Sequence, residues 1–143
     1  MTSKYLLDTN VISDSMRPRP NPNVLEKLKI HQLEIATATV VIHELLYGCW
    51  RLPESKRRTF FEQYLEDLVL TLPLFDYDLK SARYHARERV RLSKIGTVAA
   101  FADGHIASIA VTNDLVLVTN NVTDFQDFEG IEIENWFDLS RSQ

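Results

Sequence analysis

Residues 4–13 read KYLLDTNVIS, and this stretch places one carboxylate, Asp8, at the end of an apolar run. Three apolar residues come directly before it, and Val11 and Ile12 follow. A charge in such surroundings is costly unless it is solvated, hydrogen-bonded, paired or bound to a metal. The stretch therefore predicts a short strand that ends at a polar position. Asp8 is there either a turn or helix-capping residue or part of a ligand-binding site.

The rest of the chain alternates short apolar runs with longer segments of helical periodicity. This alternation is typical of an α/β fold with parallel strands. We expect strands at 4–8, 34–36, 74–75, 116–119 and 131–134, with helices between them. The proline-rich segment RPRPNPN, at 17–23, is expected to form a loop. We predict a twisted central parallel sheet of four to five strands flanked by helices, as one domain over 1–143.

Composition narrows the class of protein. The 143 residues are 45% hydrophobic and 25% charged, which is typical of a folded globule. No apolar run approaches the roughly 20 residues that span a bilayer, so we expect a cytoplasmic location. The single cysteine, Cys49, excludes an internal disulfide and a multi-cysteine zinc site. A net charge of −4 argues against coating nucleic acid by bulk positive charge, but it allows a local basic groove.

Two further carboxylates lie among apolar residues within predicted helices. Glu44 lies in VVIHELLYG (40–48), and it is expected to point at a shared polar centre rather than at bulk water. Asp103 lies in AAFADGHIASIA (99–110), where Gly104 indicates close packing or room for a ligand.

A polar cluster follows the predicted strand at 116–119. The segment VLVTNNVTDF (116–125) ends its apolar run in Thr119, with Asn121 and Asp124 shortly after. The arrangement mirrors that of Asp8, because polar oxygens follow an apolar strand in both places. Oxygen ligands of this kind suit Mg²⁺ or Mn²⁺ better than Zn²⁺. Metal ions bound by several carboxylates catalyse phosphoester hydrolysis.

These segments together resemble the PIN-domain family and, within it, the VapC-like toxins of toxin–antitoxin pairs. The matching pieces are LLDTNVIS, HELLYG, ADGHIASIA and LVLVTNNVTDF, which occur in family order over nearly the full length. The resemblance implies a PIN fold and a metal-dependent endoribonuclease that hydrolyses RNA, such as a tRNA or another structured RNA. It also implies a homodimer and a VapB-like antitoxin partner, through which alone the protein would reach operator DNA.

The resemblance carries over to particular residues of this chain. It implies that Asp8, Glu44 and Asp103 form the acidic core, with Asp8 and Asp103 as metal ligands. Thr119 would orient Asp8, and Asn10 would stabilise the turn beside it. Catalytic roles at the rim would fall to Asn121 and Asp124.

One position departs from the family pattern. Many members carry Asp where this chain has Asn121, so one negative charge is missing and a tight second metal site is not expected. The alternative hypothesis is therefore a PIN module without strong catalysis that acts with its antitoxin as a DNA-binding regulatory complex.

Two surfaces could bind partners. Basic residues at steps of four, four and three form a ridge that could contact RNA phosphates or could be a solvated helix face. They lie beside an apolar stripe, Ala82, Ala86 and Val90, that is expected to point inward. The ridge residues are Arg83, Arg87, Arg91 and Lys94. The aromatic-rich stripe from Phe60 to Leu72 is expected to pack mainly in the core, with the remainder as a groove for the antitoxin.

Overall fold

A computed structural model describes residues 2–137 and shows one five-stranded parallel sheet. The strands are β1 (Tyr5–Leu7), β2 (Ile35–Ala38), β3 (Leu74–Phe75), β4 (Val116–Val118) and β5 (Ile133–Glu134). All five overlap the predicted strands. β1 and β4 each end one residue earlier, directly before a polar side chain, β2 extends two residues further, and β5 is two residues shorter. The prediction of an α/β fold with a parallel sheet is confirmed.

The order of the strands is β3-β2-β1-β4-β5, so β1 lies at the centre of the sheet. The chain builds outward on one side of β1 through β2 and β3, and then returns to add β4 and β5 on the other side. Ligands of open α/β sheets bind outside the carboxyl ends of the strands at such a reversal. The register pairs Leu7 of β1 with Val118 of β4. Asp8 and Thr119 therefore follow side by side at this edge of the sheet.

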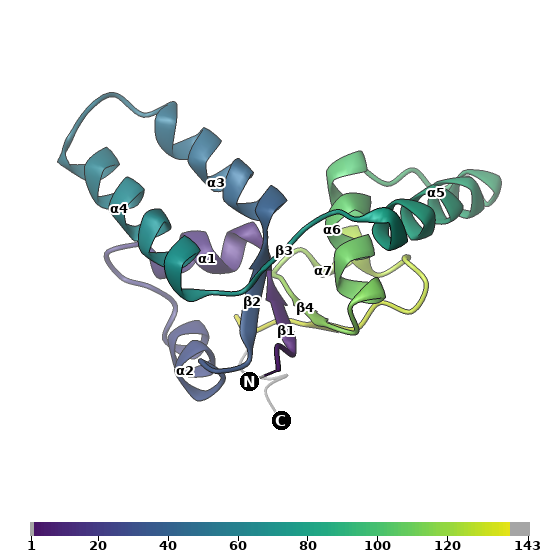
Figure 1. The fold of residues 1–143 in the computed structure, drawn as a ribbon, viewed down its shortest axis with the longest axis horizontal. Helices are drawn as coiled ribbons and strands as arrows, with labels where there is room; N and C mark the ends of the chain where they lie inside the picture. The colour runs from purple at the N-terminus through teal and green to yellow at the C-terminus, as the bar shows by residue number, and fades with distance from the viewer. Residues whose placement is uncertain (1, 138–143) are drawn as a thin grey trace.

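Seven helices connect the strands within the described residues. They are α1 (Thr9–Ser15), α2 (Pro22–Ile30), α3 (Thr39–Trp50), α4 (Lys56–Thr71), α5 (Leu79–Lys94), α6 (Phe101–Thr112) and α7 (Val122–Phe125). Figure 1 shows the α3–α4 hairpin projecting on one side of the sheet, and α5, α6 and α7 on the other. None of the helices in 2–137 is long and apolar enough to cross a membrane.

The core forms around the two central strands. Leu6 of β1 and Leu117 of β4 have no exposed surface, and α6 buries Ile109 against them. Strands covered on both faces read as continuous apolar runs, which is why YLL and VLV show no alternation. The hairpin is less buried: Leu65 is the only residue of α4 that is fully buried, and Phe60 is 55% exposed.

The buried face of α5 differs from the sequence prediction. Ala86 and Val90 face solvent, and Ala82 is only partly buried. The residues that α5 buries are mostly polar: Ser81, His85, Glu88 and Leu92. Apolar periodicity pointed to the wrong face because each buried polar group has a hydrogen-bond partner that the local sequence does not reveal. Glu88, for example, accepts a hydrogen bond from the backbone N–H of Glu129 at 2.7 Å.

Gly104 allows α6 to pack closely on α5. A Cβ atom at this position would collide with Nε2 and Cδ2 of the His85 imidazole. We expect Gly104→Ala to lower the free energy of unfolding by about 1–3 kcal/mol, the usual cost of overpacking a tight contact. Chemical denaturation measures the change.

Gly48 of α3 provides the matched control, because no atom lies within 4 Å of the place where its Cβ would be. Gly48→Ala should stabilise the protein by up to about 1 kcal/mol through helix propensity. Equal effects of the two substitutions would contradict the assigned role of Gly104.

Candidate active site

Asp8 is a buried carboxylate, 3% exposed, whose oxygens accept four hydrogen bonds. Oδ1 accepts from the backbone N–H of Thr9 at 2.8 Å and from the Thr9 hydroxyl at 3.2 Å. Oδ2 accepts from the Thr119 hydroxyl at 2.8 Å and from the Asn10 amide at 3.2 Å. The residue is also the N-cap of α1. It is thus the capping residue that the sequence offered as one alternative, and its part in a ligand-binding site stays a prediction.

A hydrogen-bond network fixes the ends of β1 and β4 to each other. The Asn10 amide also donates to the Thr119 hydroxyl at 3.2 Å, and its Oδ1 accepts from the backbone N–H of Asn120 at 2.9 Å. The Thr119 hydroxyl accepts a further bond from the backbone N–H of Asn121 at 3.0 Å. The orientation of Asp8 is therefore set by groups from both strand ends.

Asp103 lies in the first turn of α6 and is partly buried. Its pKa is raised above the usual range, first by burial and then by the negative charges of Asp124, Asp8 and Glu44. These three carboxylates, from the N-cap of α1, from α3 and from α7, are thus within electrostatic reach of Asp103 on α6. The acidic residues that the sequence predicted for the site therefore influence one another electrostatically, and their joint role as a site stays a prediction.

Glu44 differs from the expectation of a carboxylate turned away from bulk water. It is exposed on α3, at the border of a face that buries Val41, Leu45 and Cys49. Its charge still acts on Asp103. Glu44 therefore stands at the open side of the acidic cluster.

Asn121 and Asp124 are exposed at the start of α7. Asn121 is the N-cap residue of this helix, but its side chain makes no capping hydrogen bond. Asp124 lies in the first turn, and of the three neighbouring carboxylates it has the largest effect on Asp103.

The donor set fits a hard divalent cation that keeps water ligands. The charges that act on Asp103 all come from carboxylates, and no cationic side chain contributes to its shifted pKa. Within residues 2–137, no three His, Cys, Asp or Glu side chains form a ready-made chelate for one ion. Mg²⁺ typically binds one or two carboxylates and retains several waters, whereas structural Zn²⁺ requires a closed set of protein ligands.

The basic ridge is only partly available to a ligand. Arg83, Arg87 and Lys94 are exposed. Arg91 instead forms a bidentate ion pair with Glu88, at 2.7 and 2.8 Å, and donates to the backbone carbonyl of Asp127. The Arg91 guanidinium lowers the pKa of Glu88. Arg91 therefore anchors α5 to the segment before β5, and its guanidinium is already engaged within the protein. A contact of Arg91 with RNA stays a prediction.

Sequence reasoning missed two polar residues of the network. Asn120 bonds Asn10 through its backbone, and its side-chain oxygen accepts from the Asn135 amide at 3.3 Å. Asn135 directly follows β5, as Asp8 and Thr119 follow β1 and β4, and Asn120 is the second residue after β4. That position was the one signal that could have identified them.

Comparisons with known proteins agree with this geometry. The family model of the PIN domain matches residues 5–130 of this chain. The chain belongs to the PIN domain family. It is 29% identical over 133 residues to the tRNA(fMet)-specific endonuclease VapC of Salmonella typhimurium, a match that covers 93% of this chain and 98% of the relative. It is 31% identical over 134 residues to the VapC ribonuclease Y4jK of Sinorhizobium fredii, covering 91% and 95%.

A solved structure shows the same fold. VapBC2 from Rickettsia felis, bound to a DNA fragment from its promoter, contains a chain that matches with a TM-score of 0.80 and 28% identity. The match covers 95% of this chain and 99% of that one. The resemblance to VapC-like toxins that the sequence indicated is thereby confirmed.

Asp103 provides a test of the electrostatic description of the PIN site. A raised carboxylate pKa means that ionisation disfavours the folded state, so stability is lost as the pH rises through the folded pKa. Without divalent cations, Asp103→Asn should therefore raise the melting temperature at pH 7. The gain should disappear as the pH falls below the ordinary Asp pKa of 3.8. Thermal unfolding in EDTA, from pH 7 to below that pKa, measures the difference in melting temperature.

Asp67→Asn serves as the control, because this carboxylate lies on the exposed face of α4. Adding Mg²⁺ or Mn²⁺ should stabilise the wild type more than Asp103→Asn. A loss of stability in Asp103→Asn at pH 7 without metal would contradict the description.

Proposed function

We propose that the chain is a Mg²⁺- or Mn²⁺-dependent endoribonuclease that hydrolyses RNA phosphodiester bonds. The observation that carries this proposal is that three other carboxylates, Asp8, Glu44 and Asp124, raise the pKa of Asp103 through their charges, while Thr119 holds Asp8 in place. An uncompensated acidic cluster at the carboxyl ends of parallel strands suits a cation and the phosphate that accompanies it. The relatives named as ribonucleases and endonucleases support the assignment.

Asp8 and Asp103 would hold the metal ion. When bound, the ion supplies Lewis-acid activation of water and neutralises charge that develops on the phosphate. Thr119 and Asn10 hold Asp8 in one orientation, and the longer 3.2 Å contacts of Asp8 are those that a cation can displace. Glu44 and Asp124 border the cluster, where they would orient water and phosphate. Asn121 contributes an uncharged rim, so one firmly held ion is proposed rather than two.

The proposed products are RNA ends with a 5′-phosphate and a 3′-hydroxyl. A tRNA or another structured RNA is the proposed substrate class, in line with a relative that is named for tRNA(fMet). Exposed Arg83, Arg87 and Lys94 would attract phosphates beside the acidic cluster. The reaction would take place in the cytoplasm, where such RNA is found.

A VapB-like antitoxin is the proposed protein partner, because the VapBC2 structure is a toxin–antitoxin complex. The α4 helix leaves Phe60, Val69 and Leu70 exposed, and an apolar surface of this kind suits a partner segment. We also propose a homodimer that binds operator DNA only through the antitoxin.

The second candidate function is a regulatory module with little or no catalysis. The DNA-bound VapBC2 complex and the amide at Asn121 favour it. The three carboxylates of Asp8, Glu44 and Asp103 favour the nuclease. Sequencing the 5′ ends of RNA incubated with purified, antitoxin-free protein and Mg²⁺ or Mn²⁺ distinguishes the two. The absence of metal-dependent ends above an Asp8→Asn control would support the regulatory module.

Graded substitutions test the role of Asp8. Asn is also a good N-cap residue, so Asp8→Asn should keep the fold. It should lower the cleavage rate by more than about 100-fold, because groups that only orient a metal ligand already contribute about 10- to 100-fold. Thr119→Val should lie within that smaller range. Initial rates, with circular dichroism as the check on folding, measure both, and Asp67→Asn is expected to match the wild type. Full activity in Asp8→Asn would overturn the assignment.

A further inference from the structure

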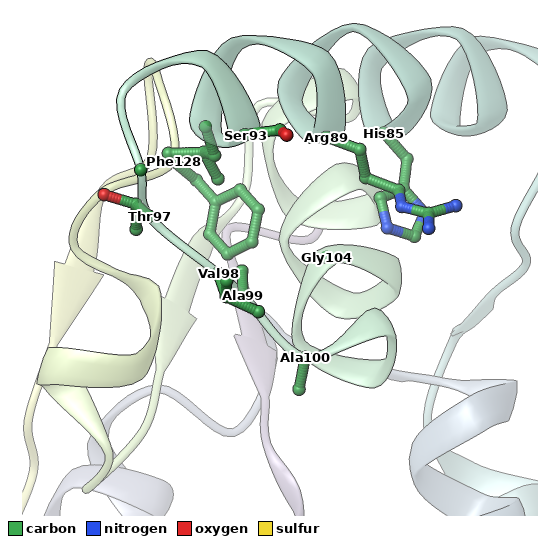
Figure 2. Close-up of a pocket in the computed structure, with 11 residues that line it drawn as sticks. His85, Arg89, Ser93, Thr97, Val98, Ala99, Ala100, Gly104 and Phe128 are labelled. Atoms are coloured by element: carbon green, nitrogen blue, oxygen red, sulfur yellow. The ribbon is translucent and has the colours of Figure 1, made fainter.

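A cavity of about 260 Å³ lies between the end of α5, the segment 96–100 and the start of α6. None of the candidate active-site residues lines it, but Gly104, which follows Asp103 directly, does. Figure 2 shows His85 and Arg89 together at one end of the cavity, next to Gly104, and Phe128 facing it from the other side. The cavity is therefore distinct from the candidate active site, and Gly104 connects it along α6 to Asp103.

The walls combine apolar surface with few polar groups. Leu92 and Phe128 are buried, at 2% and 4% exposure, and provide an apolar floor. Ser93 and Thr97 add hydroxyls at the side. The volume is slightly below the roughly 300–1,000 Å³ of typical small-molecule sites, so it suits a single ring system.

His85 is a buried polar side chain with one unused nitrogen. The residue is 2% exposed, and its Nδ1 shares a hydrogen bond of 2.9 Å with the Tyr77 hydroxyl. No group within residues 2–137 hydrogen-bonds Nε2, which packs against Gly104 where a side chain is missing. Burial and the Arg89 charge lower the pKa of His85, so the ring is neutral at pH 7. A neutral imidazole offers one donor and one acceptor, so Nε2 can bind a ligand group.

Phe101 and Arg89 form a stacked pair next to the cavity. Phe101 is 57% exposed, and the Arg89 guanidinium lies 5.3 Å from the centre of its ring. The His85 ring also packs against the Phe101 ring, with the two ring centroids 4.6 Å apart. Exposed aromatic rings and guanidinium planes are the surfaces on which unpaired RNA bases stack.

The start of α6 favours a neutral ligand over an anion. Ala100 is the N-cap residue and provides no side-chain hydrogen bond, so first-turn amides of α6 remain available as donors. Asp103 in the same turn already places a negative charge there, and a phosphate would be repelled. A planar, uncharged group with polar edges fits both the apolar floor and these donors.

We propose that this cavity binds an unpaired RNA base that flanks the scissile phosphodiester. The base stacks beside Phe101 and Arg89, and its polar edge meets His85 Nε2 and the Ser93 hydroxyl. The inference rests on the proposed ribonuclease function, because it places the base one residue along α6 from a proposed metal ligand. In this proposal Phe101 and Arg89 bind the base, and the RNA position that they contact must be unpaired.

The test uses a short RNA that spans the position which the wild-type protein cleaves most strongly. An abasic nucleotide is introduced in turn at each of the three positions on either side of that bond, and kcat/KM is measured with Mg²⁺. One abasic position should lower kcat/KM by roughly 5- to 150-fold, the size of a lost base–aromatic stack. Phe101→Ala should cause a similar loss on the intact RNA and should show no further loss on that abasic RNA, since coupled changes are not additive.

A second exposed aromatic–arginine pair provides the matched control. Tyr47 is 58% exposed, and Arg51 lies 5.2 Å from its ring centre. Neither residue lines the cavity, whereas Phe101 packs against two residues that do, His85 and Arg89. Tyr47→Ala should leave kcat/KM within about twofold of the wild type and should keep the full abasic effect. Circular dichroism confirms that both variants fold.

Two results would count against the proposal, and they are distinguishable. The base-binding cavity would be overturned if every abasic RNA were cleaved with the same kcat/KM as the intact RNA. It would also be overturned if Phe101→Ala and Tyr47→Ala lowered kcat/KM equally. Either result would leave the nuclease assignment intact. No metal-dependent cleavage by the wild type would overturn the proposed function and, with it, the assignment of the cavity.

Discussion

The pairing of β1 with β4 is the constraint on which the site depends. Because Leu7 and Val118 are partners in a parallel register, Asp8 and Thr119 emerge at the same edge of the sheet. Their 2.8 Å hydrogen bond joins residues 111 positions apart in the sequence. A one-residue shift in this register would turn Asp8 toward the other face of the sheet and remove the Thr119 donor from a buried carboxylate. The apolar strands and the polar site therefore stabilise the same arrangement.

A second constraint is electrostatic. Asp8 is fully supplied with hydrogen-bond donors, whereas Asp103 faces three other carboxylates and carries a raised pKa. A protein without a ligand gains nothing from such repulsion, and perturbed carboxylates in one place are characteristic of functional sites. Membership of the PIN domain family gives this cluster a chemical context. We propose that this repulsion is tolerated because a bound cation would offset it.

The sequence was informative wherever a segment's neighbours in the chain are also its neighbours in space. The strands were predicted because buried parallel strands are short apolar runs, and Asp8 and Thr119 were found because they end such runs. The prediction failed on α5, where polar residues are buried by partners remote in sequence, such as Glu129 for Glu88. It also placed Glu44 in a buried setting, although the residue lies at the border of its helix face. The cavity beside α6 could not be predicted, because it depends on how α5 folds back on α6 and on Phe128, which is remote in sequence from the other lining residues.

The central claim is that the acidic cluster holds a divalent cation between Asp8 and Asp103. Crystals of the protein grown with Mn²⁺ and measured for anomalous scattering test it most directly. The account predicts a Mn²⁺ peak within bonding distance of an oxygen of Asp8 and an oxygen of Asp103, and no such peak in crystals of Asp8→Asn. An empty cluster at saturating Mn²⁺, or a peak bound elsewhere in the chain, would contradict it.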